Sequence, residues 1–386
     1  MDVLPFALPD ISQAEIDGVT ECLKAGWLTA GRKVKQFEEE LARFVGAKHA
    51  IACSSATNAA LLIFDALKIN DKCEVVVPAY TFSGPAMMAH RLGAKIVLAD
   101  CLPGSYQIDP DHVEELITPA TALVVPTHFA GQACDMKRLK SICDKQGVLL
   151  VDDAAHAFPT VDGSTGRIVG NGKDSMATFF SFYATKTLTT GVGGMITTDS
   201  DVLANAIRNI RTHGFNRDIA DRYTNRQTGW RYDIAAPGWK ANMTDVAASL
   251  GLAQLNRTAE MHERRQLLAN CYTSNLVRYP IGLPDMGIPS AWHLYPIQVR
   301  ERDAFVRSMG LQGVQCSVHF IPLHHHTQWQ RITGKEPGDL PWADRMFAGE
   351  VSLPLFSKMT EEDSDRVCNA VRVALSEEAL CACRNQ

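Results

Sequence analysis

Short apolar runs alternate with helical patterns through the first half of the chain. The runs have the length of strands and lie at residues 49–53, 74–77, 94–99, 122–125, 148–151, 176–182 and 193–198. Helical patterns separate them at 57–67, 85–92, 111–117, 136–144 and 202–211. Such alternation implies right-handed βαβ crossovers. We therefore predict an α/β fold with a mostly parallel sheet sandwiched by helices.

The segments on either side of this region look different. Residues 1–12 form an extended arm, and Ser12 with Glu15 matches a capping box for a helix over 13–24. Residues 212–240 are polar and irregular, which is typical of a functional or covering loop. A long helix is expected from Asp245 towards Leu276, followed by strands at 293–299 and 315–320 and helices at 303–309 and 361–375.

These patterns predict two domains. A large α/β domain, including the arm, covers residues 1–250, and a smaller α+β domain covers 251–386.

Bulk properties exclude several classes of protein. A net charge of −5 over 386 residues gives no electrostatic reason to expect nucleic-acid binding. No apolar run is long enough to span a bilayer, so no membrane partner is expected. The first residues lack the features of a signal peptide, and the eleven cysteines form no framework. Reduced thiols and a cytoplasmic location are the simplest expectation.

A lysine near the end of one strand is the lead candidate for chemistry. Lys186 lies in FFSFYATKTLTTGVGG, where charged residues are scarce. Most lysines are solvated surface residues, but that explanation fits this segment poorly. A lysine among apolar and small residues can have a lowered pKa and act as an amine nucleophile. Open α/β sheets bind ligands beyond the carboxyl ends of their strands, where Asp153 and Ser181 also fall.

Other candidates each have a plainer alternative. The segment SSATNAA (54–60) can bind an anion at a helix N-terminus or simply cap a helix. Phe82 can stack on a planar ligand or pack in the core. Asp153 and His156 have a spacing compatible with metal, but no further ligands are evident. Asp153 can also cap a helix, or hold a ring nitrogen protonated, as an aspartate does in pyridoxal phosphate enzymes.

Pyridoxal phosphate needs a Schiff-base lysine, a phosphate cradle and a pyridinium partner. Lys186, the pair Ala56–Thr57 with Ser181, and Asp153 would supply all three. The segment HFIPLHHH (319–326) offers four histidines. We regard contact with sugar or phosphate and plain loop packing as about equally good explanations. Both rank above a metal, and we expect no metal site. Lys240 is either a phosphate contact or a surface charge.

The ordered motifs resemble those of the DegT/StrS-type sugar aminotransferases. They include SSATNAALL, EVVVPAYTF, THFAGQACDM, LLVDDAAHA, FFSFYATKTLTTGVGGM, GWKANMTDVAASLGLAQL and SVHFIPLHHH. The match extends over nearly the whole chain from GWLTAG onward. The resemblance implies a fold type I transferase that uses pyridoxal 5′-phosphate (PLP), with pyridoxamine 5′-phosphate (PMP) as intermediate. It also implies a homodimer with shared active sites.

The resemblance also assigns roles to individual residues. Lys186 matches the Schiff-base lysine, Asp153 the aspartate facing the pyridine nitrogen, and Phe82 the ring that stacks on the cofactor. The other implied cofactor contacts are His156 near the phenolic oxygen, Ala56, Thr57 and Ser181 at the phosphate, and Lys240 reaching the phosphate of the neighbouring subunit. The implied substrate contacts are Thr29, Tyr183, Trp239, His319 and His324.

Several positions depart from the family pattern. The family usually has glycine at Ala56, and Tyr183, Val192 and Asn242 replace a histidine, a glutamate and an arginine. The last three changes leave the chemistry of Lys186 in place and are expected to affect substrate fit.

The expected reaction moves an amino group from L-glutamate to a keto group of a nucleotide-linked sugar. There are two alternatives. One is a sugar dehydratase, an activity of some relatives that carry histidine in place of the lysine. The other is a non-catalytic regulator with the same fold.

Overall fold

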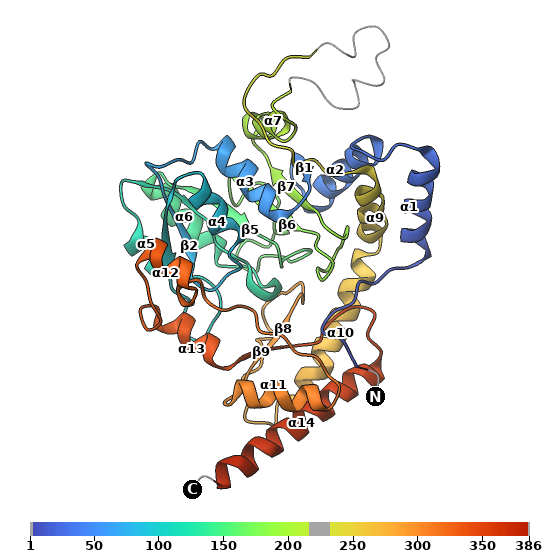
Figure 1. Cartoon of the computed structure of the whole chain (residues 1–386), viewed down its shortest axis with the longest axis vertical. Coiled ribbons are helices and arrows are strands. Elements are labelled where there is room, and N and C mark those ends of the chain that lie inside the picture. The colour runs from blue at the N-terminus through green and yellow to red at the C-terminus, as the bar shows by residue number, and fades with distance from the viewer. Residues whose placement is uncertain (1–2, 216–231, 385–386) are drawn as a thin grey trace.

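A seven-stranded sheet forms the centre of the first two thirds of the chain (Figure 1). The computed structural model describes residues 3–215 and 232–384. The strand order is β1-β7-β6-β5-β4-β2-β3, and only β7 runs antiparallel to its neighbours. The predicted mostly parallel sheet is confirmed. The strands are β1 (His49–Cys53), β2 (Glu74–Pro78), β3 (Lys95–Ala99), β4 (Thr121–Val124), β5 (Leu149–Asp153), β6 (Ala177–Ser181) and β7 (Gly194–Thr198).

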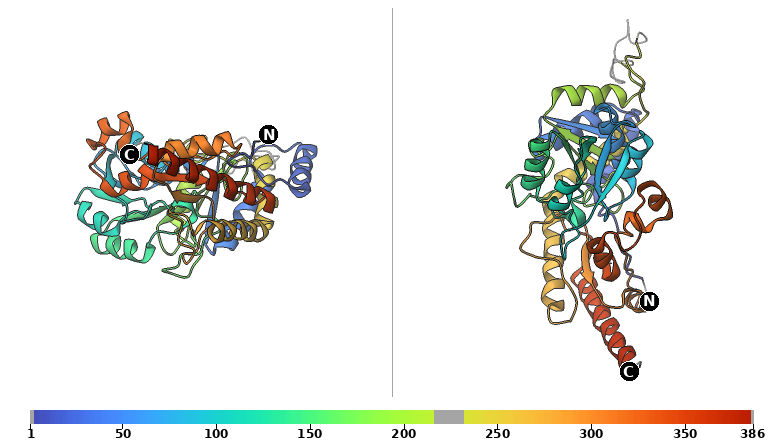
Figure 2. Two further views of the ribbon diagram at one scale, coloured as in Figure 1. Left: turned by 90° about the horizontal axis from the view of Figure 1, so that it is seen from below. Right: turned by 90° about the vertical axis from the view of Figure 1, so that its left-hand side faces the viewer.

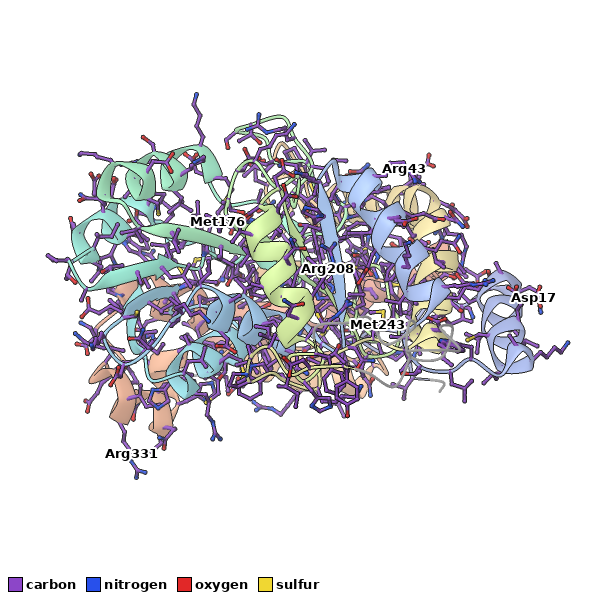
Figure 3. The ribbon with its side chains drawn as sticks, turned by 90° about the horizontal axis from the view of Figure 1, so that it is seen from above. Asp17, Arg43, Met176, Arg208, Met243 and Arg331 are labelled. Atoms are coloured by element: carbon purple, nitrogen blue, oxygen red, sulfur yellow. The ribbon has the colours of Figure 1, made fainter. Side chains whose placement is uncertain are left out.

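Helices cover both faces of this sheet, as the alternation predicts (Figure 2). One face carries α3 (Ala56–Ala66), α4 (Gly84–Arg91) and α7 (Asp201–Ile210). The other carries α2 (Arg32–Val45), α5 (Pro110–Leu116), α6 (Met136–Gln146) and α9 (Asp245–Asn256). The helix α1 (Gln13–Ala25) packs on α9 at the margin of the molecule, where Figure 3 labels Asp17.

The strands divide their apolar side chains between the two layers. In β2, Val75 and Val77 join the core beneath α3 and α4, whereas Val76 joins the core beneath α5 and α6. This alternation follows from the two-residue period of a strand. A parallel sheet buried on both faces therefore needs the continuous apolar runs seen in the sequence.

The last third of the chain forms a second, smaller core. Strands β8 (Tyr295–Gln298) and β9 (Glu350–Leu353) pair antiparallel and pack with α10 (Thr258–Leu276), α11 (Arg302–Leu311) and α14 (Glu361–Arg384). Short 3-10 turns lie at η1 (Phe129–Gly131) and η2 (Leu323–His325). The helices α12 (Thr327–Thr333) and α13 (Pro341–Gly349) contribute to the core of the large sheet instead. The predicted boundary between residues 250 and 251 stays a prediction.

Two sequence-based expectations about elements are wrong. Residues 315–320 do not form a strand, because only Ser317 makes an isolated bridge, to Ser352. The long helix expected from Asp245 is two helices, since Arg257 leaves helical geometry between them. The irregular stretch at 212–240 lies partly outside the described residues.

The N-terminal region behaves as predicted. Ser12 and Glu15 form the capping box of α1, and Gly26 ends that helix in the left-handed conformation. The arm before it pairs with the second core, where Leu4 N–H donates to the carbonyl of Gly313 at 2.8 Å. Among the described helices, none has both the length and the apolar character that a bilayer crossing requires.

Candidate active site

Two strand ends and one strand start meet at the same edge of the sheet. Asp153 is the last residue of β5, and Ser181 is the last residue of β6. Gly194 begins β7, and because β7 is antiparallel it pairs with both Ser181 and Cys53. The polar residues predicted to converge at the carboxyl ends of the strands are therefore placed at one rim.

Only one of the two adjacent aspartates faces this rim. The carboxylate of Asp152 accepts hydrogen bonds from the hydroxyls of Ser175 and Thr178, each at 3.0 Å. Asp153 points to the opposite side of the strand, where it accepts from Ala155 N–H at 2.9 Å. Burial raises the pKa of Asp153 to about 6, although the Ala155 N–H and the charge of Lys186 act in the other direction.

The start of α3 lies directly against the start of β7. A Cβ atom on Gly194 would lie 2.6 Å from the carbonyl carbon of Ser55 and 2.7 Å from the nitrogen of Ala56. The absence of a side chain at Gly194 thus allows the helix N-terminus to approach Ser181. Backbone N–H groups at such a terminus bind anions, and the helix dipole favours negative charge there.

Phe82 and Thr57 border the same space. A Cβ atom on Gly84 would lie 3.2 Å from both the Phe82 ring and the Thr57 hydroxyl, so the two side chains flank one glycine. The Phe82 side chain is 59% exposed, which is unusual for a phenylalanine beside a core helix. An exposed ring next to an anion-binding helix end suits a planar, phosphorylated ligand.

Lys186 is held between an acid and an imidazole. Its Nζ lies 3.3 Å from Nε2 of His293. Burial lowers the pKa of Lys186 to about 8, although the negative charge of Asp153 opposes the shift. About a tenth of this amine is therefore neutral at pH 7, far more than for a solvated lysine, and the neutral form is the nucleophile.

Aromatic and imidazole rings form one wall of the site. His156 contacts His293 with ring centroids 4.4 Å apart and Phe320 at 5.6 Å, and Phe320 contacts Phe82 at 6.0 Å. The Nδ1 atom of His156 accepts from Ala130 N–H at 3.3 Å. Burial, assisted by Lys186, lowers the pKa values of His156 and His293 well below the usual range and that of His319 to about 4. These imidazoles are neutral at pH 7.

Comparison with known proteins identifies the chain. Residues 9–372 match the model of the DegT/DnrJ/EryC1/StrS aminotransferase family. The chain belongs to this family.

Individual relatives agree with this assignment. The spore coat polysaccharide biosynthesis protein SpsC of Bacillus subtilis is 41% identical over 380 residues, which is 96% of each chain. The aminotransferase TlmJ from Streptoalloteichus hindustanus is 30% identical, with 97% and 99% of the two chains covered and a TM-score of 0.88. Spr1654 of Streptococcus pneumoniae, a candidate sugar aminotransferase solved in its PLP form, is 29% identical with the same coverage and a TM-score of 0.89.

The protein is thus a PLP-dependent sugar aminotransferase of fold type I, and its own residues fit the cofactor. Asp153 is a buried carboxylate, and burial opposes its ionisation. A protonated ring nitrogen beside it would therefore stabilise its negative charge. The α3 N-terminus and Ser181 suit the phosphate, Phe82 suits the ring face, and Lys186 suits the aldehyde. This fit rests on the donor set and on the two close approaches at Gly84 and Gly194.

Four predicted site residues of the aminotransferase, Thr29, Tyr183, Trp239 and Lys240, form no hydrogen bond with the amine of Lys186 among the described residues. Thr29 accepts through its carbonyl from Asp245 N–H at 3.2 Å, and Trp239 donates from Nε1 to Asp65 at 2.8 Å. Tyr183 is 53% exposed. Lys240 bonds to the side chain of Asn242, in a segment that runs beside the end of β1. The roles of these residues stay predictions.

His324 belongs to a separate cluster. Its Nε2 lies 2.8 Å from Oδ1 of Asp344, and His325 bonds to the same oxygen. These three side chains are close enough to share a metal ion. Two N–H donors on one carboxylate oxygen account for the arrangement without one, and no contact found among the described residues joins His324 to Lys186.

His293 and Phe320 were not singled out from the sequence. His293 lies in the apolar run AWHLYP and Phe320 in a segment taken for a strand, so only the fold brings them to Lys186. A histidine within an otherwise apolar run was the available signal.

Proposed function

We propose that this aminotransferase moves the amino group of L-glutamate to a keto group of a nucleotide-linked sugar. The observation that carries the proposal is the amine of the half-buried Lys186, which has a pKa of about 8 and lies beside Asp153 and His293 at the rim of the sheet. SpsC is a spore coat polysaccharide biosynthesis protein, which supports an amino sugar destined for a polysaccharide as the product.

Each residue has a defined task in this proposal. PLP, when bound, supplies an electron sink for electrons released at the carbon that loses or gains the amino group. The neutral amine of Lys186 would hold the cofactor and, once released, would serve as the general acid and base for the proton that moves at the reacting carbon. Asp153 would keep the ring nitrogen protonated, while Ala56, Thr57 and Ser181 would bind the phosphate. Phe82 would lie against the ring, and His156 would lie near its phenolic oxygen.

The substrate class is tested with a panel of nucleotide-linked 3-keto and 4-keto sugars and L-glutamate. We expect one class to yield an amino sugar with matching release of 2-oxoglutarate. Loss of water from the sugar without incorporation of nitrogen would contradict the proposal and favour a dehydratase.

The pH dependence of cofactor capture tests the state of Lys186. Only the neutral amine attacks an aldehyde, so attachment of PLP to the cofactor-free protein should speed up as pH rises through about 8. The neutral fraction grows roughly 50- to 100-fold between pH 6 and pH 9 for such a pKa. Stopped-flow absorbance of PLP measures the rate, and a midpoint near that of an ordinary solvated lysine would contradict the burial of this amine.

We further propose that the protein works as a homodimer with shared active sites. Large apolar side chains on and beside α1 are exposed, which is typical of a surface that a partner covers. They are Leu8, Ile11, Ile16, Leu23 and Leu28. Lys240 and Trp239 are also exposed at the loop that the family resemblance assigns to the neighbouring site.

Mixed dimers test the sharing of sites. If Lys186 and Lys240 act in different subunits of one site, mixing the inactive variants Lys186→Ala and Lys240→Ala should restore up to a quarter of wild-type activity. Half of the dimers are then mixed, and one of their two sites has both lysines. Light scattering verifies the dimer, and a lack of restoration in proven mixed dimers would show that Lys240 serves its own subunit.

A further inference from the structure

A fully buried carboxyl group lies behind the active site and is connected to it through hydrogen bonds. Glu350 and Ser352 alternate on one side of β9, and both are completely buried. Ser352 Oγ lies 2.6 Å from Oε1 of Glu350 and 2.9 Å from Nδ1 of His319. The second oxygen of Glu350 accepts from the backbone N–H of His319 at 2.8 Å. His319 is thus connected to one carboxyl group twice, directly through its backbone N–H and through Ser352 by its ring.

The imidazole of His319 lies between the rings of Phe6 and Phe320, with both centroid distances at 5.2 Å. His319 is half-buried, and within the described part of the chain we find no hydrogen-bond partner for its Nε2. Its ring contacts the Phe320 ring, which in turn contacts Phe82 and His156. Burial, and to a lesser degree the charge of Lys186, lowers the pKa of His319 to about 4.

The single hydroxyl proton of Ser352 couples the states of its two neighbours. When Glu350 is ionised, Ser352 donates to it, so Ser352 must accept from Nδ1–H and the Nε2 of His319 is unprotonated. When Glu350 is protonated, it donates to Ser352, which then donates to Nδ1, and Nε2 carries the hydrogen. The protonation of Glu350 therefore selects the tautomer of His319.

We propose that Glu350, Ser352 and His319 form a relay that carries one proton between a substrate in the active site and the buried carboxyl group. This inference rests on the proposed function, since its substrate is the amino donor L-glutamate. The ammonium group of the donor gives a proton to Nε2, while Nδ1–H passes to Ser352 and the Ser352 hydroxyl proton passes to Glu350. The donor amine is then neutral, Glu350 is a neutral acid, and no charge or atom is left over.

The surroundings of Glu350 allow both of its protonation states near neutral pH. Burial raises the pKa of Glu350 to about 8, while the hydroxyl of Ser352, the N–H of His319 and the charge of Arg302 lower it. The titratable groups that face it are Tyr80 after β2, Tyr106, Arg302 at the start of α11, Cys316 and His319. Burial also raises the pKa values of both tyrosines and of the cysteine, so these groups remain neutral.

Long-range ¹H–¹⁵N spectra of the histidine-labelled holoenzyme read the tautomer directly, with His319 assigned by its loss in His319→Gln. We expect Nε2–H below the pKa of Glu350 and Nδ1–H above it. In Glu350→Gln the amide donates to Ser352 at every pH, so His319 should keep Nε2–H throughout. Ser317→Ala is the matched control, because Ser317 meets Ser352 only through backbone hydrogen bonds, and it should behave as wild type.

The kinetic readout is the half-reaction with L-glutamate, followed by cofactor absorbance. Ser352→Ala should slow it roughly 100-fold with KM changed little, which is the lower end of the range for acid–base catalysis. The proton inventory should change from curved to linear in this variant. Two results would overturn the relay. The first is that His319 keeps one tautomer from pH 6 to pH 10 in the wild-type enzyme. The second is that Ser352→Ala reacts with L-glutamate at the wild-type rate. A holoenzyme that ignores L-glutamate yet shows the tautomer change would overturn the proposed donor and support the relay.

Discussion

Replacing Lys186 by alanine is expected to abolish amino transfer and leave the fold intact. The side chain is half-buried and its only hydrogen bond found among the described residues is to His293, so few stabilising contacts are lost. The proton transfer between substrate and cofactor carbons loses its acid and base, and turnover should fall roughly 10⁴-fold or more. The purified variant should lack the visible absorbance of lysine-linked cofactor.

An exposed lysine from a nearby part of the chain is the control for this result. Lys173→Ala removes a charge from the surface and should keep the wild-type spectrum and rate. A Lys186→Ala protein that turned over within tenfold of wild type would remove Lys186 from the chemistry and return the regulator and dehydratase alternatives to consideration.

Replacing Asp153 by asparagine is expected to have the second largest effect. A neutral amide cannot hold the cofactor's ring nitrogen in its protonated form, so the electron sink weakens and turnover should fall roughly 10³-fold. The negative charge of Asp153 raises the pKa of Lys186, so its loss should shift that pKa below 8. The pH profile of PLP attachment should move in the acid direction in this variant.

The neighbouring aspartate separates a site effect from a general one. Asp152→Asn alters hydrogen bonds to Ser175 and Thr178 on the other face of β5. This variant should unfold at a lower temperature but keep the wild-type cofactor absorbance and pH profile. If Asp152→Asn and Asp153→Asn behaved alike, the assignment of Asp153 to the ring nitrogen would fail.

The parts of the fold that were predictable have strong local signals. Strands β1, β2 and β5 lie where apolar runs in the sequence predict them. The runs are continuous because both faces of a parallel sheet are buried. The capping box at Ser12 and Glu15 was equally readable. In contrast, β9 includes Glu350 and Ser352, whose buried polar side chains hide it from any apolar pattern. The strand wrongly predicted at 315–320 has the opposite cause. Phe320 is apolar because it packs against Phe82 and His156 in the wall of the site, and it does not belong to a sheet.

The site was predictable where residues follow strand ends. Asp153, Ser181 and Lys186 needed only the rule that ligands lie beyond the carboxyl ends of parallel strands. His293, Ser352 and Glu350 come from the second core, and their approach to the rim depends on how that core packs. Local patterns contain no information about such long-range packing, which is why these residues were not found.

The pairing of Leu4 with Gly313 and Gln315 has a consequence for how the protein is made. The ribosome releases the arm first, but the segment that receives it is synthesised about three hundred residues later. Ala56, the predicted phosphate contact, likewise precedes His293 and His319 in the order of synthesis. During translation the nascent chain therefore holds an incomplete pocket and an unpaired arm. The contacts that His293 and His319 make near Lys186 and Phe320 can therefore form only after most of the chain has emerged.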